Sequence, residues 1–338
     1  MNILVTGGAG YIGSHASLYL KEKGFNPIII DNFSRSSHNY ARKYLSNYTL
    51  IEGCIGNSEK IKDILTQYRI EGIIHFAAYA YVAESVKNPT MYYRNNVSES
   101  IAFLESVNSF YNNTKSKQPP IIFSSTCSVY GETEDRLISE NTKTNPLNPY
   151  AKTKIIVEDI LSELHKVEGM SSISFRYFNA AGADAELRAG ENHQPETHLI
   201  PLLIDSAINE EKKEFSIYGK DYPTNDGTCI RDYTHVSDIA NAHILGLERL
   251  LNIDHHCNEV INLGSGTGSS NLEVLQVVEE VTGCKINYTF ADRRKGDAAS
   301  LIANNQRARD KLGWEPKQSN LKEIIKNAHA WQVRRRYI

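Results

Sequence analysis

The sequence has neither a long hydrophobic run nor an excess of positive charge. No stretch approaches the roughly 20 apolar residues of a membrane-spanning helix, and the N-terminal MNILVTGG lacks the basic and apolar regions of a signal peptide. The formal net charge is −3, and the basic run at residues 334–336 is short and terminal. Binding to a phosphate backbone needs a basic surplus. We therefore expect a cytoplasmic protein that binds neither nucleic acid nor membranes.

Cysteine is also scarce. The five cysteines are scattered without a Cys-x-x-Cys pair, and their number is odd. This usage is typical of reduced intracellular thiols and argues against a disulfide framework. The histidines show no ligand spacing matched to nearby cysteines, so we predict that the protein has no metal site.

The 338 residues, 41% hydrophobic and 23% charged, have the composition of a globular protein large enough for two domains. The first half alternates β-branched runs with amphipathic stretches, which indicates an α/β fold with a doubly wound parallel sheet (Rossmann). After residue 179, loops rich in Gly, Pro and Asn predict a second, smaller α/β domain that binds the substrate. The predicted strands are 2–6, 27–31, 49–52, 72–76, 120–125 and 171–177. The predicted helices lie near 13–23, 58–68, 89–111 and 149–166.

A glycine-rich turn links the first predicted strand to the first helix. Gly7, Gly10 and Gly13 follow NILVT at a spacing that allows a tight turn and close approach of the backbone to a pyrophosphate. Asp31, at the end of the next strand, can accept hydrogen bonds from ribose hydroxyls and repel a 2′-phosphate. We therefore predict NAD as the cofactor, and an ordinary glycine turn is the alternative.

A later glycine cluster, at residues 264–268, lacks the third glycine spacing, and we interpret it as structural. Ser270 and Glu273, which follow it, match a helix capping box. A helix end is predicted at Gly313, within KLGWEP.

Tyr150 and Lys154 are four residues apart, so they share one face of a predicted helix. A tyrosine has a pKa near 10, and lowering it by about three units requires about 4 kcal/mol of phenolate stabilisation, which nearby cations can supply. Tyr19/Lys23 and Tyr111/Lys115 have the same spacing. Only the 150/154 pair follows a strand that ends in hydroxyl residues, 124–126, at the sheet edge where ligands bind. This pair is the predicted catalytic one.

Motifs along essentially the whole chain resemble those of the UDP-glucose 4-epimerases, which are extended short-chain dehydrogenases/reductases. They are, in order, TGGAGYIGSH, DNFSRSS, HFAAYAYVAESV, SSTCSVYGE, NPYAKTK, RYFNAAGA, THLIPLL, DYPTNDGTCIRDYTHV and RRKGD. The resemblance implies an NAD-binding domain at 1–179 and a UDP-sugar-binding domain at 180–338, with some segments returning to the first domain. It also implies a homodimer.

The resemblance assigns roles to individual residues. Tyr150 would be the base at the sugar 4-hydroxyl, bridged by Thr126, and Lys154 would hold the nicotinamide ribose. The implied cofactor-binding residues are Gly7, Gly10, Tyr11, Ile12, Gly13, Asp31, Asn32, Ile55, Phe76, Ala77, Ala78, Asn95, Ser124, Tyr150, Lys154 and Tyr177. The implied substrate-binding residues are Thr126, Asn179, Leu199, Tyr218, Arg231, Arg294, Asp297 and Leu301.

The implied reaction interconverts UDP-galactose and UDP-glucose by transient oxidation at C4 with bound NAD. Leu301 aligns with a residue that faces the C2 substituent, where tyrosine excludes N-acetylhexosamines, so activity on UDP-N-acetylglucosamine is expected. Cys54 replaces an aspartate that contacts adenine in relatives, and His198 stands where some have asparagine. Pentose 4-epimerases, dehydratases, decarboxylases and a non-catalytic NAD-binding regulator are the alternatives. Dehydratases and decarboxylases carry an acid where this chain has Cys127 and Ser128.

Overall fold

The structure is a computed structural model that describes residues 1–209, 214–294 and 297–336. The chain forms two compact units. The first unit comprises residues 1–129, 146–176 and 240–261, and the second comprises 130–145, 177–239 and 262–338. These units are defined by contacts alone, so the assignment of NAD to residues 1–179 and of a UDP-sugar to 180–338 stays a prediction.

A seven-stranded sheet forms the centre of the first unit. Its strands are β1 (Asn2–Thr6), β2 (Asn26–Asp31), β3 (Thr49–Glu52), β4 (Ile70–His75), β5 (Ile121–Ser124), β6 (Ser172–Tyr177) and β11 (Asn258–Leu263). The order is β11-β6-β5-β4-β1-β2-β3, and β1 to β6 pair in parallel. The strands β1, β2 and β3 follow one another toward one edge of the sheet, and the chain then crosses to the other side of β1 to form β4. This switch in strand order is typical of doubly wound dinucleotide-binding folds. The predicted fold class is confirmed, and each predicted strand matches within two residues.

Helices connect and cover these strands. They are α1 (Tyr11–Glu22), α2 (His38–Tyr44), α3 (Ser58–Gln67), α4 (Val82–Lys87), α5 (Pro89–Tyr93), α6 (Glu99–Thr114), α7 (Pro149–Glu168) and α9 (Val236–Asn252). A π-helical turn, η1 (Arg94–Ser98), joins α5 to α6, and a 3₁₀ turn, η2 (Cys127–Tyr130), follows β5. The single helix predicted near 89–111 is thus interrupted by the π turn.

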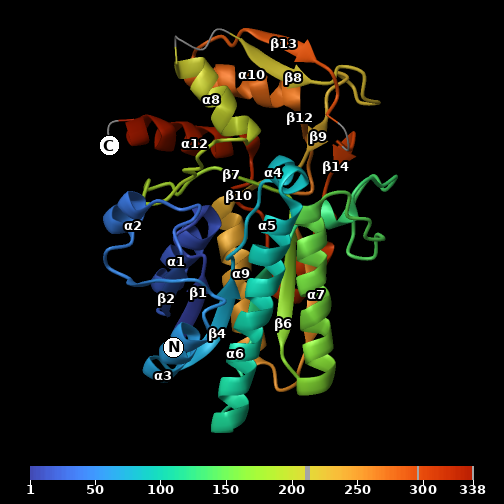
Figure 1. Cartoon of the computed structure of the whole chain (residues 1–338). Coiled ribbons are helices and arrows are strands. Elements are labelled where there is room, and N and C mark those ends of the chain that lie inside the picture. The colour runs from blue at the N-terminus through green and yellow to red at the C-terminus, as the bar shows by residue number, and fades with distance from the viewer. Residues whose placement is uncertain (210–213, 295–296, 337–338) are drawn as a thin grey trace. The chain divides into compact units, whose positions relative to one another are not determined.

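The two faces of the sheet are covered by different helices (Figure 1). On one face, α3, α6 and α7 contribute apolar side chains such as Phe103 and Val157 to a core that includes Phe123 of β5. On the other face, α9 approaches closely because Gly246 has no side chain. A Cβ there would lie 2.8 Å from the Phe175 ring. The sequence did not identify α9 as the returning segment.

Three small sheets and four helices make up the rest of the described chain. The strands are β7 (Asn179–Ala181), β8 (Phe215–Tyr218), β9 (Ile230–Arg231), β10 (Tyr233–His235), β12 (Ser269–Ser270), β13 (Tyr288–Ala291) and β14 (Ser300–Leu301). They pair as β10-β7, β12-β9-β14 and β13-β8. The helices are α8 (Leu199–Ile208), α10 (Asn271–Thr282), α11 (Gln306–Leu312) and α12 (Leu321–Arg336).

The core of this unit lies among α8, α10 and α12, where Leu203, Val274 and Ile324 are buried together (Figure 1). The predicted capping box begins α10, since the Ser270 hydroxyl accepts from the Glu273 amide while the Glu273 carboxylate accepts from the Ser270 amide. Gly313 ends α11 in the left-handed region, as predicted.

The sequence predicts neither a membrane-spanning helix nor a disulfide framework. Among the described residues, no helix combines the length and apolar character needed to cross a membrane. The structure describes all five cysteines, and none is part of a disulfide.

Candidate active site

The turn between β1 and α1 has the geometry of an anion-binding loop. Gly7 has a φ of +67°, and a Cβ on Gly13 would lie 2.4 Å from the Gly7 carbonyl oxygen, so both positions require glycine. Gly10 caps α1, whose first backbone N–H groups have no carbonyl partner within the helix. These donors and the positive end of the helix dipole suit a pyrophosphate. Tyr11 and Ile12, two other predicted cofactor residues, form the start of α1.

Asp31 fixes the end of β2 against this turn. Its carboxylate accepts hydrogen bonds from the Ala9 amide at 3.0 Å, the Phe33 amide at 2.9 Å and the Ser36 hydroxyl at 2.8 Å. Burial raises the pKa of Asp31 despite these bonds. The carboxylate therefore organises the glycine turn itself, and its contact with a ribose stays a prediction.

The adenine-side residues lie near β2 and β3. The predicted Asn32 accepts from the amide and hydroxyl of Ser34. Cys54, beside the predicted Ile55, donates a hydrogen bond to Glu99 of α6 at 3.1 Å. A carboxylate from α6 thus lies beside Cys54, where the family resemblance implies an aspartate, and we did not predict Glu99.

The π turn η1 ties the loop after β4 to α7. Asn96 in this turn is buried, exchanges hydrogen bonds with the backbone of Tyr79 at 2.8 and 2.9 Å, and donates to the Thr153 hydroxyl at 3.0 Å. The predicted Asn95 donates to Asn96 at 2.9 Å. π turns of this kind often mark functional sites. Sequence reasoning missed Asn96, although it adjoins a predicted residue.

Three other predicted cofactor residues follow β4 directly. They are Phe76, Ala77 and Ala78. The Phe76 ring packs on the ring of His243 from α9, with centroids 4.7 Å apart. This segment therefore lies at the carboxyl end of the sheet, beside the glycine turn.

Tyr150 and Lys154 lie on the first turns of α7, as predicted. The Asn148 side chain caps this helix by accepting from the Ala151 amide at 2.9 Å. The Lys154 ammonium lies 6.0 Å from the centroid of the Tyr150 ring and donates to the Ser124 carbonyl at 2.7 Å. Tyr150 and Lys154 are buried, at 7% and 3% exposure. The structure thus brings the tyrosine and lysine together at the carboxyl end of β5.

Thr126, the third predicted catalytic residue, follows β5 immediately and is buried. Its hydroxyl accepts from the Ser128 amide at 3.2 Å, which fixes the start of η2. Ser124 and Thr126 therefore both come from the strand end that holds Lys154.

A buried ion pair lies one helical turn beyond Lys154. Glu158 accepts from Arg176 of β6 at 3.0 Å (Nε to Oε1) and 2.5 Å (Nη2 to Oε2), and the Ser125 hydroxyl also donates to it. Burial lowers the pKa of Lys154 to about 7, and the charge of Glu158 opposes that decrease. Sequence reasoning missed Glu158 and Arg176. Two features of the sequence could have identified them: Glu158 lies four residues after Lys154, and Arg176 is the first residue of the RYFN motif.

Of the other two Tyr-x-x-x-Lys pairs, Tyr111/Lys115 has a structural role. The Tyr111 hydroxyl donates to the Ile70 carbonyl at 2.7 Å, and burial raises its pKa to about 12. Lys115 ends α6 in the left-handed region. Tyr111 is therefore unsuited to act as a base.

The predicted substrate residues fall into several groups in the second unit. Arg231 Nη2 lies 3.8 Å from Asp297 Oδ1. In the backbone, Arg231 of β9 is paired with Leu301 of the parallel strand β14. The Arg294 guanidinium stacks on the Tyr218 ring at 4.0 Å. Arg231 and Arg294 are thus each held by neighbours.

The remaining predicted residues are placed by other elements. Asn179 begins β7 and donates to the Asp232 carbonyl at 3.0 Å, Leu199 begins α8, and Tyr177 ends β6. The substrate contacts predicted for these residues therefore stay predictions.

Asp232 organises this region and was not predicted, although it belongs to the RDY motif. Its fully buried carboxylate accepts from the amides of Ser265, Gly266 and Ala303 at 2.8–3.1 Å. Burial raises its pKa while these bonds oppose the change. The later glycine cluster is therefore held by a structural carboxylate, which agrees with its structural interpretation.

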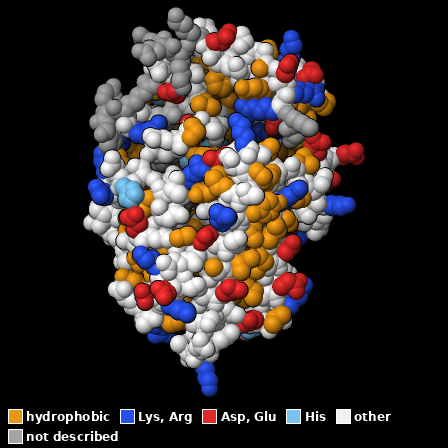
Figure 2. All heavy atoms as spheres, in the orientation of Figure 1, with side chains coloured by type: hydrophobic (Ala, Val, Ile, Leu, Met, Phe, Trp, Pro, Cys, Tyr) orange, Lys and Arg blue, Asp and Glu red, His pale blue; other side chains and the backbone are white. Residues whose placement is uncertain are grey.

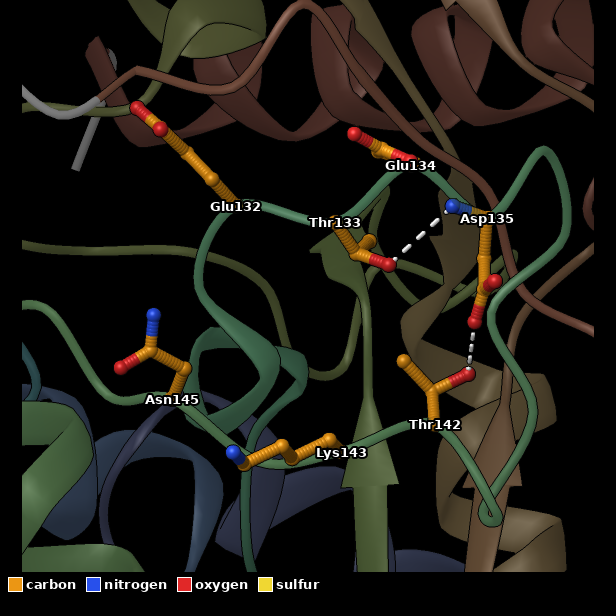
Figure 3. A pocket seen from close by; sticks show the side chains of 7 residues that line it. All are labelled: Glu132, Thr133, Glu134, Asp135, Thr142, Lys143 and Asn145. Atoms are coloured by element: carbon orange, nitrogen blue, oxygen red, sulfur yellow. Dashed lines mark hydrogen bonds between the residues drawn. The ribbon is translucent and has the colours of Figure 1, made fainter.

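A hollow of about 480 Å³ lies within residues 132–145. Figure 3 shows the Asp135–Thr142 hydrogen bond on one side of it and the Lys143 and Asn145 side chains along its lower edge. Glu132, Glu134 and Asp135 contribute three carboxylates against a single lysine. The excess negative charge disfavours a diphosphate, and none of the predicted site residues lines this hollow.

Comparison with known proteins decides the family. A UDP-glucose 4-epimerase from Rhizobium leguminosarum bv. trifolii is 42% identical over 332 residues, covering 98% of this chain and 97% of the relative. The chain belongs to the UDP-glucose 4-epimerase family. A second epimerase, from Halalkalibacterium halodurans, is 43% identical and covers 98% and 95%. Residues 4–328 also match the broader family described as GDP-mannose 4,6 dehydratase.

Solved structures of epimerases share the fold. The Brucella ovis enzyme in complex with NAD has a TM-score of 0.90 at 39% identity, covering 98% of each chain. The Bifidobacterium longum enzyme in complex with NAD⁺ and UDP has a TM-score of 0.91 at 32% identity, covering 99% of this chain and 98% of the other. The Campylobacter jejuni UDP-Glc/GlcNAc 4-epimerase has a TM-score of 0.83 at 33% identity, covering 98% and 99%.

The Glu158–Arg176 pair generates a stability prediction for this family member. Replacing Glu158→Gln leaves the Arg176 guanidinium buried without its counter-charge, and we expect a loss of about 3–5 kcal/mol in the free energy of unfolding. The matched control is Glu163→Gln, which removes an exposed pair with Lys166 on the same helix and should cost at most about 0.5 kcal/mol. Urea unfolding measures both. Equal effects would show that the buried pair has no special role.

Proposed function

We propose that the chain is a UDP-hexose 4-epimerase that interconverts UDP-galactose and UDP-glucose with bound NAD, in the cytoplasm. The observation that carries the proposal is the buried Tyr150–Lys154 pair, held by the Ser124 carbonyl at the end of the sheet where a dinucleotide would bind. The epimerase relatives crystallised with NAD and UDP support both ligands.

NAD fits the residues present. The glycine turn offers a cradle that a Cβ at Gly7 or Gly13 would fill, and the start of α1 offers backbone donors to a pyrophosphate. Bound NAD would supply a hydride acceptor for the sugar C4 and return that hydride to the other face of the 4-keto sugar. Gly10, Tyr11 and Ile12 would hold the pyrophosphate, Asp31 and Asn32 the adenosine side.

The chain's own residues move the proton. Tyr150 removes the proton from the sugar 4-hydroxyl and gives it back when the keto group is reduced, so no net proton is lost. Thr126 hydrogen-bonds the hydroxyl and the phenol, and Lys154 stabilises the phenolate by its charge. Burial lowers the pKa of Lys154, so the ammonium form is disfavoured at this position. The opposite charge of Glu158 favours the ammonium form of Lys154.

Anchoring of the UDP portion lets the keto sugar turn without leaving. Arg231 and Arg294 are the cationic residues for the diphosphate, because a guanidinium can bind phosphate oxygens bidentately. Asn179, Leu199, Tyr218 and Asp297 complete the proposed uridine diphosphate contacts.

Dehydration and decarboxylation are disfavoured by the residues after Thr126. Those reactions need an acidic helper next to the hydroxyl, and Cys127 and Ser128 occupy those positions. The broader dehydratase family match therefore reflects the shared fold.

Two copies of the chain are proposed to associate through α4 and α6. Val82, Val86 and Ile101 on these helices are 43%, 61% and 37% exposed. Figure 2 shows hydrophobic side chains gathered on the face where Figure 1 places these helices. Exposed apolar patches of this kind mark interfaces.

Light scattering tests the dimer. We expect twice the chain mass for the unmodified protein and a shift toward the single-chain mass for Ile101→Asp, because a charge would be buried at the interface. Val167→Asp, at an 80% exposed position near the end of α7, is the control and should leave the mass unchanged. A single-chain mass for the unmodified protein at micromolar concentration would contradict the proposal.

Tyr150→Phe tests the catalytic assignment. We expect epimerisation of UDP-galactose, assayed without an added electron acceptor, to fall by about 10²–10⁴-fold because the proton acceptor is lost. The control is Tyr19→Phe. Tyr19 lies four residues before Lys23, the same spacing as in the catalytic pair, and this variant should retain full activity. Unchanged turnover of the Tyr150 variant would overturn the proposed function.

Leu301 is proposed to admit an N-acetyl group at sugar C2, and the Campylobacter jejuni relative named as a UDP-Glc/GlcNAc 4-epimerase supports this proposal. Leu301→Tyr should reduce turnover of UDP-N-acetylglucosamine by at least about 10-fold by filling that space, with little change for UDP-glucose. Leu301→Met, which is similar in volume, should keep both activities. Good turnover of UDP-glucose by the unmodified enzyme with none of UDP-N-acetylglucosamine would refute the role of Leu301.

A further inference from the structure

A cluster of two histidines and two glutamates lies in the segment that precedes α8, and none of the four is among the residues proposed to act in catalysis. Glu191, His193, Glu196 and His198 each offer one ligand atom, and the four atoms lie within 4.8 Å of one another. We propose that these four residues form a binding site for one divalent transition-metal ion of the Zn²⁺ type. No metal site was predicted from the sequence, because the histidines show no ligand spacing matched to nearby cysteines.

The separations of the donor atoms suit a tetrahedral ion. At Zn–N and Zn–O bond lengths of about 2.0–2.2 Å, ligand atoms of a tetrahedral site lie about 3.4 Å apart. The Nδ1 atoms of His193 and His198 lie 2.9 and 2.5 Å from Glu191 Oε1, and 4.0 and 3.2 Å from Glu196 Oε1. These distances bracket the required value, so an ion can be admitted by small side-chain rotations.

The donor chemistry selects the kind of ion. Two imidazole nitrogens with two carboxylates suit Zn²⁺ and its neighbours in the first transition series, whereas Ca²⁺ and Mg²⁺ prefer six or more oxygens. Two glutamates balance the charge of a dication when both imidazoles are neutral. In the metal-free cluster the Nδ1 atoms of His193 and His198 instead lie within hydrogen-bond distance of the Glu191 carboxylate, so binding of the ion must displace the protons between them.

The cluster is held in place from outside, which reduces the ordering that an ion would need. The Glu191 carbonyl accepts from the Trp331 indole of α12 at 2.9 Å, and Asn192 accepts from Arg335 of the same helix at 2.8 Å. Gly190 packs so closely on the Trp331 ring that a Cβ would lie 2.4 Å from it. The backbone at 190–192 is therefore fixed on α12 by contacts that do not involve the four ligand atoms.

The other half of the cluster belongs to the start of α8. His198 is the N-cap of that helix, and Glu196 Oε1 accepts from the amides of Thr197 and His198 at 2.8 and 2.9 Å. An ion would therefore tie the first turn of α8 to the segment held by α12. Leu199, the next residue, is one of the proposed UDP contacts, so the ion would fix the backbone beside it.

Zinc titration of the full-length, untagged protein tests the site. After treatment with a chelator and dialysis, we expect one Zn²⁺ per chain by calorimetry and by metal analysis, and a thermal midpoint that rises with zinc concentration. The double variant His193→Gln/His198→Gln should lose at least about 100-fold in affinity, since even outer-shell changes cost 10–100-fold. The variant's circular dichroism and NAD binding report whether it is folded.

A matched double variant separates this site from adventitious binding. His255→Gln/His256→Gln removes two adjacent exposed histidines and should keep the single site, and Co²⁺ bound to the unmodified protein should give the intense visible bands of a tetrahedral complex. Failure to bind one zinc ion, or equal binding by the His193/His198 variant, would overturn the proposal and leave the cluster as a metal-free ion-pair network. Both readouts are made without UDP-sugar, so their outcome is independent of the epimerase activity.

Discussion

The hydrogen bond from the Lys154 ammonium to the Ser124 carbonyl is the contact on which the proposed site depends. It places a cation at the carboxyl end of β5, 6.0 Å from the Tyr150 ring and almost fully buried. A charge in such a position is unfavourable, and the burial lowers the lysine pKa to about 7. The same low exposure strengthens the interaction of the ammonium with a nearby phenolate, because little water screens it. Burial of Lys154 therefore both disfavours its ammonium form and strengthens the interaction of that ammonium with the phenolate.

Several elements that are distant in sequence support this contact. Glu158 supplies a negative charge one turn along α7, and Arg176 of β6 balances that charge. Asn96 in the π turn fixes the helix from another side through Thr153. At the other end of the proposed cofactor site, Asp31 and the glycine turn hold one another through the Ala9 amide. The parallel sheet places both sets of residues at the same edge, where its strands end.

The sequence predicted those parts of the site that depend on local patterns. The glycine turn, the Tyr150–Lys154 spacing and the Ser270–Glu273 capping box each span a few residues, so their geometry follows from the backbone conformation that those residues adopt. The parts that were missed depend on contacts across the chain. Glu158 meets Arg176 from another element, and α9 returns to the sheet through a contact made possible by Gly246. The spacing from Lys154 and the RYFN motif single out Glu158 and Arg176 separately, but no local pattern shows that the two residues pair or that Gly246 meets the sheet.

The Glu191–His198 cluster shows a different limit of sequence reasoning. Its ligands are close in sequence, but only the folded segment turns the four side chains toward one another. The predicted absence of a metal site rested on the lack of histidines spaced with cysteines, and it stays a prediction beside the proposal of a histidine–carboxylate site. His198, which the family resemblance marks as a departure, is one of the four residues of the proposed site.

The central claim is that the sugar is oxidised at C4 by hydride transfer to NAD that stays bound. The direct measurement follows UDP-galactose carrying deuterium at C4 through complete epimerisation in ordinary water with no NAD added. We predict that the UDP-glucose formed keeps its deuterium at C4 and that none appears in the solvent. Loss of the deuterium to water, or a need for added NAD in each turnover, would contradict the account.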